Sequence, residues 1–547
     1  PSFPVGAGQA VLVHASASGV ADIASLAIEI DGQPQTLDQF GRARFRPGLA
    51  GRFTVVATAT DVDGVTGTAT LDLKVRDLTD RQAPVVELAS PAEGPVLVVP
   101  VDVVGTVSDQ NLDEYRLELA PLGSEAFRLL AQGTTPVAGA VLARLDPNRL
   151  ANGAYLLRLS ARDMGGRSRE VLRLIEVSSA AKVGAYTRAE TDLAVTRGGL
   201  PLELRRFYSS LETEVQGNFG WGWSLLGADA RITTNVPPTG EEATGRFNPF
   251  GVGTRAYVNL LNGGRGGFAF TPTPLPLGGQ TFYLPAWTAG ADAAGYQLSS
   301  AQAFLELVEG KFYQVGTGLP YDPASGRFLG FDYTLTAPDG TRYGYDTLEG
   351  LKEIVGPGGQ VLIWSDSGVI APDGQRIGFQ YDREGNLNAV TDPDGMLHLY
   401  GYDRSHRLTR ALRTVSYGYH GPLANLLTEV VDPSGPGSRV VEYDAEGAVV
   451  ATYPIDRVLG ATREFLGSPA TDTLGAGETD RFAILLTDAE IATAAMGTMT
   501  IGVEVVGLGG FDPAAAVIRG PPAALSRVEL GRSLALFTLE AGGPYTI

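Results

Sequence analysis

The sequence has no cysteine, only four histidines and no long apolar run, and each absence removes a class of function. Without cysteine, disulfides, thiolate metal sites and cysteine nucleophiles are excluded. His14, His398, His406 and His420 do not stand at metal-ligand spacing, and the sequence contains neither HExxH nor a Gly-x-Ser-x-Gly nucleophile elbow. No signal peptide or membrane-spanning run is found, so we expect no membrane insertion of this segment.

Positive charge is also scarce. The chain carries 42 Lys and Arg against 61 Asp and Glu, which gives a net charge of -19 and excludes an electrostatic fit to nucleic acid. Glycine (71) and proline (34) are spread as turn residues between stretches rich in Val, Thr, Leu and Tyr, with almost no helical periodicity. The hydrophobic fraction of 44% is enough for real cores. These patterns predict an all-β fold.

A Tyr-Asp phrase repeats near the centre of the chain. It occupies residues 381–387, recurs 21 residues later at 402–408, and returns 41 residues further at 443–449. A short period indicates an array of small units that complete one another's interior. In each unit Asp suits the first position of a type I turn and Gly the left-handed position, which predicts a hairpin with a glycine bulge and an inward-facing tyrosine. The residues predicted to carry the repeat are Tyr381, Asp382, Gly385, Tyr402, Asp403, Tyr443, Asp444 and Gly447.

Turn signals and composition divide the chain into four predicted domains. Two immunoglobulin-like β-sandwiches in tandem are predicted at 1–78 and 79–179, because both end on a similar phrase of Gly, an aromatic residue, an alternating strand and Ala-x-Asp. A repeat sheet is predicted at 180–465 and a C-terminal β-sandwich at 466–547. The tandem sandwiches resemble the immunoglobulin-like modules of large bacterial surface proteins.

A second phrase precedes the repeats. Thr191-Asp192-Leu193 is followed by Leu200-Pro201-Leu202 and, after a short gap, by residues 218–225, which contain Trp221 and Trp223. Together with the Tyr-Asp array, this pattern resembles the Rhs/YD-repeat family of bacterial Rhs proteins, toxin-complex cocoons and teneurins. The resemblance implies hairpins wound into a spiralling sheet that can close into a hollow shell. It also implies that both tryptophans lock the start of that sheet, rather than forming a sugar-stacking platform.

The departures from the family pattern limit what it implies. Complete shells of the family use many more repeats than this chain carries, and the self-cleaving end of the family has no counterpart in the sequence. We therefore expect an open, curved sheet without an enclosed toxin.

No cofactor and no metal are predicted. Calcium is the small ligand with the best case, because Asp61 with Asp63, and Asp109 with Asp113, place oxygens at alternating spacing in loops between strands. Ordinary Asp/Gly turn chemistry explains both loops as well, and neither completes a known calcium loop.

These observations predict a structural or adhesive segment of a large secreted or surface-exposed bacterial protein, and no enzyme. Its partners would be other domains of a longer polypeptide, since the chain opens on Pro1 without methionine, and a cell-surface protein, a glycan or copies of itself. Two alternatives stay open: a delivery scaffold for a polymorphic toxin, and a filament subunit joined by β-augmentation. A glycosidase-type carboxylate pair hidden among the acids is the remaining enzymatic alternative.

Overall fold

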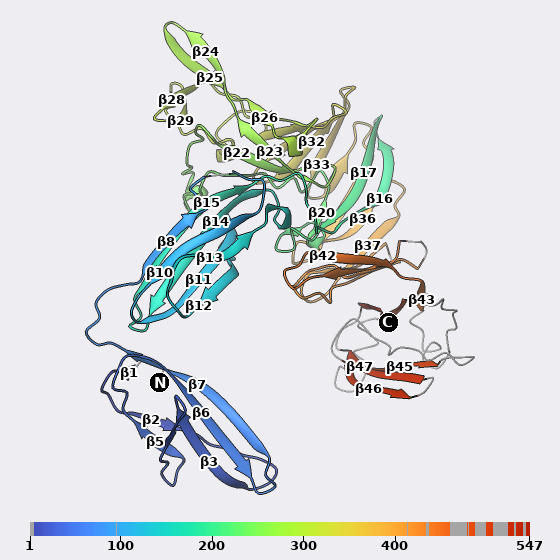
Figure 1. Ribbon diagram of the computed structural model, residues 1–547. Coiled ribbons are helices and arrows are strands. Elements are labelled where there is room, and N and C mark those ends of the chain that lie inside the picture. Colours follow the sequence, from blue (N-terminus) through green and yellow to red (C-terminus); the bar gives the residue numbers. More distant parts are fainter. Residues whose placement is uncertain are drawn as a thin grey trace. The chain divides into compact units, whose positions relative to one another are not determined.

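The chain folds almost entirely into β-strands, which confirms the predicted fold class (Figure 1). Four short 3-10 helices are the only helices among the described residues, and none of these is long and apolar enough to cross a membrane. The chain divides into one unit of residues 1–146 with 154–176, and a second of 147–153 with 177–547. The computed structural model describes residues 5–94, 96–197, 199–412, 414–433, 437–459, 479, 481–486, 499–506, 523–529, 532–539 and 543–546.

The first unit begins with a small sandwich. Its strands are β1 (Val5–Gly6), β2 (Val11–His14), β3 (Ile23–Ile30), β4 (Gln33–Gln35), β5 (Arg42–Phe45), β6 (Gly51–Asp61) and β7 (Thr66–Arg76). A five-stranded sheet in the order β1-β7-β6-β3-β4 faces the β2–β5 pair. The apolar face formed by strand alternation meets in a core of Ile28, Ile30, Val55, Leu73 and Val75.

A second sandwich completes this unit. Its strands are β8 (Val85–Ser90), β9 (Val96–Leu97), β10 (Val101–Ser108), β11 (Leu112–Pro121), β12 (Arg128–Gly133), β13 (Val137–Leu145), β14 (Gly153–Asp163) and β15 (Ser168–Val177). They form sheets in the orders β13-β10-β8 and β12-β11-β14-β15-β9. Leu117, Leu157 and Leu159 are fully buried at its centre. The linker at residues 77–84 connects β7 to β8.

The second unit opens with a lead segment (residues 186–230), followed by short sheets. This part of the unit contains three short helices, η1 (Pro147–Arg149), η2 (Glu242–Thr244) and η3 (Ala291–Ala293). Its strands are β16 (Thr187–Arg197), β17 (Leu200–Ser209), β18 (Gln216–Gly217), β19 (Gly220–Trp221), β20 (Trp223–Leu225), β21 (Thr233–Thr234), β22 (Arg255–Asn259), β23 (Arg265–Phe270) and β26 (Trp287–Ala289). The long β16–β17 hairpin pairs with β20, and β21-β22-β23-β26 form a four-stranded sheet.

A separate sheet of four strands carries its own aromatic core. Its elements are β24 (Thr273–Leu277), β25 (Gln280–Leu284), β28 (Leu305–Val308), β29 (Lys311–Gln314) and the nearby η4 (Pro323–Ser325). Phe250, Phe270, Leu305, Phe312 and Tyr321 are buried together beside it. Edge-to-face ring contacts, such as Phe250 against Phe270 at 5.5 Å between centroids, build this core.

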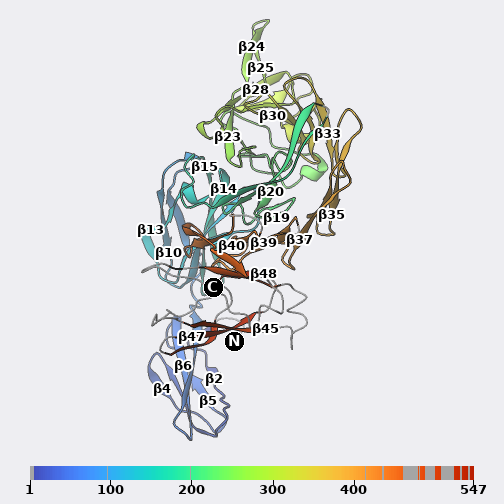
Figure 2. The same ribbon diagram turned by 90° about the vertical axis from the view of Figure 1, so that its right-hand side faces the viewer.

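The repeats form one continuous antiparallel sheet of fourteen strands. These are β27 (Gln297–Ser300), β30 (Tyr333–Thr336), β31 (Arg342–Asp346), β32 (Gly350–Val355), β33 (Val361–Ser365), β34 (Gly368–Ile370), β35 (Arg376–Tyr381), β36 (Leu387–Thr391), β37 (Leu397–Tyr402), β38 (Leu408–Ala411), β39 (Val415–Gly418), β40 (Glu429–Val431), β41 (Arg439–Tyr443) and β42 (Val449–Pro454). The described sheet is open, as expected, with β27 and β42 at its ends. Figure 2 shows it curving from β30 through β35 to β40, with β19 and β20 on the concave side.

The Tyr-Asp hairpins turn as the sequence predicts. Asp382 Oδ1 accepts the backbone N–H groups of Glu384 and Asn386 at 3.0 and 2.8 Å, and Gly385 is left-handed with φ 85°. The pairing register shifts between Gln380 and Tyr381, where the bulge lies. The same pattern of Asp Oδ1 contacts returns at Asp403 and Asp444, with His406 at φ 62° in the glycine position of the second copy.

Two further three-stranded sheets are described near the C-terminus. Their strands are β43 (Arg457–Leu459), β44 (Phe482–Leu486), β45 (Met499–Val506), β46 (Ala523–Glu529), β47 (Arg532–Leu539) and β48 (Gly543–Thr546). The sheet orders are β43-β44-β48 and β45-β47-β46. The predicted C-terminal sandwich at 466–547 otherwise falls outside the described residues.

Candidate functional site

A buried arginine stands at the centre of the second unit. Arg206 lies on β17 directly opposite Glu190 on β16, and Asp192 occupies the bulge beside them. The guanidinium makes a bidentate contact with Asp192, Nε–Oδ2 2.5 Å and Nη2–Oδ1 2.9 Å, and Nη2 also reaches Glu190 Oε2 at 2.6 Å. The side chain of Arg206 is only 1% exposed. A charge removed from water to this degree requires such partners.

Two tyrosines of the repeat sheet join this cluster. Tyr417 on β39 accepts a hydrogen bond from Arg206 Nη1 at 2.9 Å and donates its own hydroxyl hydrogen to Glu190. Tyr400 on β37 donates to Asp192 Oδ2 at 2.7 Å. The lead segment is thereby fastened to strands that follow it by about two hundred residues, 211 in the case of Arg206 and Tyr417. We call Glu190, Asp192, Arg206, Tyr400 and Tyr417 the arginine lock.

Aromatic rings enclose the guanidinium. Its Cζ atom lies 5.2 Å from the ring centre of Trp223 and 5.6–5.7 Å from those of Phe219, Tyr400 and Tyr417. Burial opposes the ionisation of Glu190, but the charges of Arg206 and Arg188 and the Tyr417 hydrogen bond hold its pKa below the usual value. Burial also opposes the charge of Arg206, yet Tyr417 and Asp192 raise its pKa well above the ordinary range. The lock is therefore a charged cluster at neutral pH.

The two predicted tryptophans occupy different environments. Trp223 is 1% exposed, its ring lies 5.3 Å from Tyr208 and 5.0 Å from Tyr417, and its Nε1 donates to the hydroxyl of Tyr419 at 2.9 Å. Trp221 is half-buried on β19, where it pairs with Gln216. Trp223 thus packs inside the repeat sheet, whereas Trp221 lies at its margin.

The loop between β18 and β19 contacts the repeats through the backbone and the side chain of Asn218. Asn218 O accepts from Leu387 N at 2.7 Å, and Asn218 Oδ1 accepts from the Tyr381 hydroxyl at 2.9 Å. Gly220 has φ 85°, and a Cβ there would lie 2.3 Å from His406 O, so only glycine fits. Half-buried Asp229 also holds this loop by accepting from Asn218 N at 3.0 Å.

Tyrosines of the repeats link successive hairpins through hydrogen bonds. The hydroxyl of Tyr402 donates to Leu387 O at 2.7 Å, and that of Tyr443 donates to Leu427 O at 2.9 Å. Both leucines are fully buried. Tyr381 differs from the expected inward orientation, because it is 36% exposed and buries its hydroxyl end against Asn218.

Sequence patterns do not single out Arg206. Strand alternation places it on the same face of β17 as Leu204 and Tyr208, which are 2% and 0% exposed. A charged residue on an otherwise buried face was the available signal, and it indicates a paired charge. In chemical terms the lock can hold two segments together, since each of its ionisable groups already contacts another member of the cluster.

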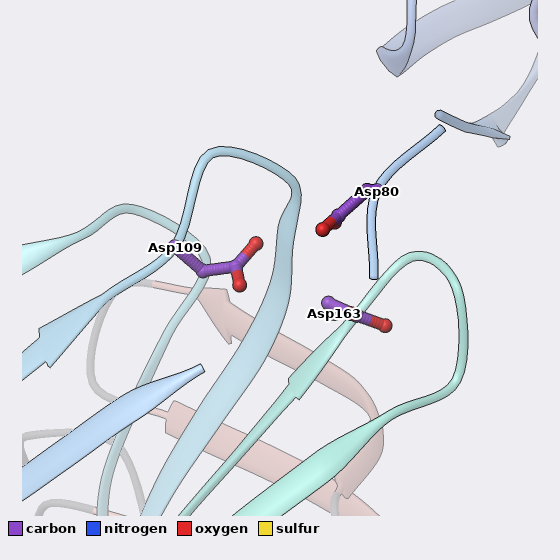
Figure 3. A group of neighbouring side chains, drawn as sticks. All are labelled: Asp80, Asp109 and Asp163. Carbon is purple, nitrogen blue, oxygen red and sulfur yellow. The ribbon is translucent and has the colours of Figure 1, made fainter. Parts of the chain in front are cut away.

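The first unit holds the only group of three or more potential metal ligands found among the described residues. Asp80 from the linker, Asp109 after β10 and Asp163 at the end of β14 place carboxylate oxygens within 4.8 Å of one another (Figure 3). Asp109 is thus the one member of the two candidate calcium loops of the sequence that joins this group, while Asp61, Asp63 and Asp113 do not. Asp61 Oδ1 caps its own turn by accepting from Asp63 N at 3.0 Å, and Asp113 forms an ion pair with Lys74 at 2.7 Å.

The carboxyl group of Asp322, which is largely removed from water, predicts that the stability of the second unit depends on pH. Asp322 caps η4 by accepting from Ala324 N at 3.0 Å, and burial, with the charges of Asp332 and Glu242, raises its pKa to about 7. A raised carboxyl pKa stabilises the fold below the unfolded pKa near 4, and this contribution is lost as pH rises towards 7. The loss is at most about 4 kcal/mol.

We expect Asp322→Asn, which keeps the capping oxygen, to remove this loss. In urea unfolding followed by tryptophan fluorescence, the variant should be more stable than the native chain at pH 8 and equal to it near pH 4. All four tryptophans lie in the second unit, so the signal reports on that unit alone. Asp373→Asn, at an exposed turn, is the control and should show no such trend. A pH-independent difference between Asp322→Asn and the native chain would contradict the assignment.

Two family models match parts of the second unit. The model of a domain of unknown function, DUF6531, matches residues 181–235, which contain the lead segment. The model of the RHS repeat matches residues 367–395, which contain the first Tyr-Asp hairpin. No curated protein matches the sequence.

Several solved structures share β-sandwich features with the chain. The fibronectin(III)-like modules of Clostridium thermocellum CbhA are 15% identical over 32% of this chain and 90% of theirs, with a TM-score of 0.19. The protein SGBP-B of Bacteroides ovatus, in complex with a mixed-linkage heptasaccharide, is 11% identical over 56% and 68%, with a TM-score of 0.14. A Ca2+-stabilized adhesin of an Antarctic bacterium that binds ice is 15% identical over 70% and 92%, with a TM-score of 0.12.

Proposed function

Because this chain belongs to the Rhs/YD-repeat family, we propose that it is a structural and adhesive segment of a large secreted or surface-exposed bacterial protein. In this proposal the tandem sandwiches space binding surfaces, and the repeat region is a rigid body that withstands pulling. The segment has no catalytic role of its own.

The observation that carries the proposal is that the open repeat sheet packs against the lead segment and shares one core with it. Fourteen strands are paired one after another, with bulges at the Tyr-Asp hairpins, and one core cluster runs from Tyr186 in the lead segment to Val441 in the last hairpin. The arginine lock ties the beginning of this cluster to strands β37 and β39. A continuous sheet fixed by buried, charge-assisted contacts favours mechanical rigidity.

Single-molecule stretching of the full chain tests this role. We expect the repeat region, roughly residues 186–455, to open in one high-force step that releases roughly 90 nm of chain, since an extended residue spans about 3.4 Å. Each sandwich should release roughly 25–30 nm separately. The length of the large step distinguishes a cooperative body from independent hairpins.

Two results would overturn the proposal. Peeling of the repeats at low force in steps of roughly 7 nm, the length of one 21-residue period, would remove the mechanical role. Turnover of a glycan by the purified chain would replace it with an enzymatic one. For the adhesive part, labelled chain should bind intact cells in a saturable manner, and cell binding that never saturates would count against it.

A further inference from the structure

The group of Asp80, Asp109 and Asp163 joins two parts of the first unit, the linker and the second sandwich. Asp80 lies in the linker, while Asp109 directly follows β10 and Asp163 ends β14 of the second sandwich (Figure 3). The two sandwich loops are joined by a hydrogen bond from Met164 N to Asn111 O at 2.8 Å. The mutual distance of up to 4.8 Å between the three carboxylate oxygens matches ligands placed 2.3–2.6 Å from one shared calcium ion.

The local charge is not balanced. One cation contacts the group: Arg167, with Nη2 at 3.1 Å from Asp80 Oδ2 and Nε at 3.0 Å from Asp163 Oδ2. Three carboxylates and one guanidinium leave two negative charges.

One oxygen of the group is buried without a hydrogen bond. The side chain of Asp163 is 0% exposed, and its Oδ1 accepts from Arg167 N at 2.9 Å. Its Oδ2 has no hydrogen-bond donor, because the nearby Arg167 Nε points instead at Gln82 O, 2.9 Å away. The Arg167 guanidinium lies 3.0 Å from this oxygen without donating a hydrogen bond to it, so a buried carboxylate oxygen is left available to coordinate a metal ion.

We propose that Asp80, Asp109 and Asp163 bind one Ca2+ ion, which fixes the linker at residues 77–84 to the second sandwich. The ligands are all hard oxygens, without histidine or cysteine, and such a set favours calcium over zinc or copper. Three carboxylates can supply up to six oxygens, and water can complete the shell. Because Asp80 belongs to the linker and the other two to the sandwich, release of the ion loosens the linker, which then keeps only its contacts with Arg167 and Asn111.

Limited trypsin digestion of the full chain provides the test, since Arg81 lies exposed inside this linker. We expect cleavage after Arg81, followed by mass spectrometry, to slow about tenfold when free calcium is ten times its Kd. Calorimetric titration of chelator-treated protein with calcium alone should give one saturable site. Equal protection by magnesium at the same concentration would overturn the calcium assignment.

Two variants make the test specific. Asp109→Asn replaces one anionic ligand with a neutral amide oxygen and leaves both partners of Arg167 in place, so it should strongly weaken calcium binding and protection. Asp63→Asn, in the Asp61 turn, is the matched control and should keep both. Protection retained in Asp109→Asn, or no calcium binding by the native chain, would overturn the proposal. The measurement on the native chain decides the question even if the variant fails to fold.

Discussion

Replacement of Arg206 by methionine should lower the free energy of unfolding of the second unit by about 3–5 kcal/mol. Methionine fills a similar volume, so packing is largely kept, but Glu190 and Asp192 lose the cation that compensates them. Both carboxylates are at most 15% exposed. Urea unfolding at pH 7, read from tryptophan fluorescence, measures the loss.

The neighbouring arginine supplies the control. Arg205 faces the other side of the same strand, is 38% exposed and has only a 3.9 Å ion pair with Glu203, so Arg205→Met should cost less than about 1 kcal/mol. The deficit of Arg206→Met should shrink at pH 4–5, where the orphaned carboxylates can take up protons. A loss no larger than that of Arg205→Met would show that the lock does not stabilise the sheet.

Truncation of Trp223 to alanine should be as damaging, at about 3–5 kcal/mol. The ring is 1% exposed and contacts Tyr208 and Tyr417, and its N–H is the donor to Tyr419. Alanine leaves a cavity at the junction of the lead segment and the repeat sheet. Trp223→Phe should recover part of the loss, because a ring remains although the donor is gone.

Trp221 is the matched control for this truncation. It is the same residue type two positions earlier, yet it is only half-buried, so Trp221→Ala should cost about 1–2 kcal/mol. The three remaining tryptophans of the second unit still report unfolding in either variant. Equal losses at both positions would contradict the view that Trp223 is the anchoring residue.

The hairpins could be predicted because their chemistry is local. Asp382 and Gly385 stand three residues apart, and the carboxylate and the left-handed glycine determine the turn without help from the rest of the chain. The phrase repeats, so the side-by-side order of the hairpins also follows from the sequence. The fold class is predictable on the same grounds.

The lock and the aspartate group could not be predicted in this way. Arg206 and Tyr417 are 211 residues apart, and nothing near either residue specifies the other. Asp80 lies in a linker whose sequence looks like an ordinary turn, whereas Asp109 and Asp163 belong to the second sandwich. Only the packing of that sandwich brings the three aspartates together. The short spacing of Asp109 and Asp113 suggests that they share one ligand. In the structure, however, Asp109 lies with Asp80 and Asp163, and Asp113 forms an ion pair with Lys74.

The span of the arginine lock has a consequence for biosynthesis. The arginine lock is complete only once Tyr417 has been made, and the carbonyl of Gly184, just before the lead segment, accepts from Val449 N, so the contact order of this region is high. At about 5–20 residues per second, the ribosome needs roughly 10–50 seconds to deliver the chain between these points. During that interval the contacts of the β16–β17 hairpin with the repeat sheet are incomplete, and apolar surface that is transiently exposed in this way is prone to aggregation.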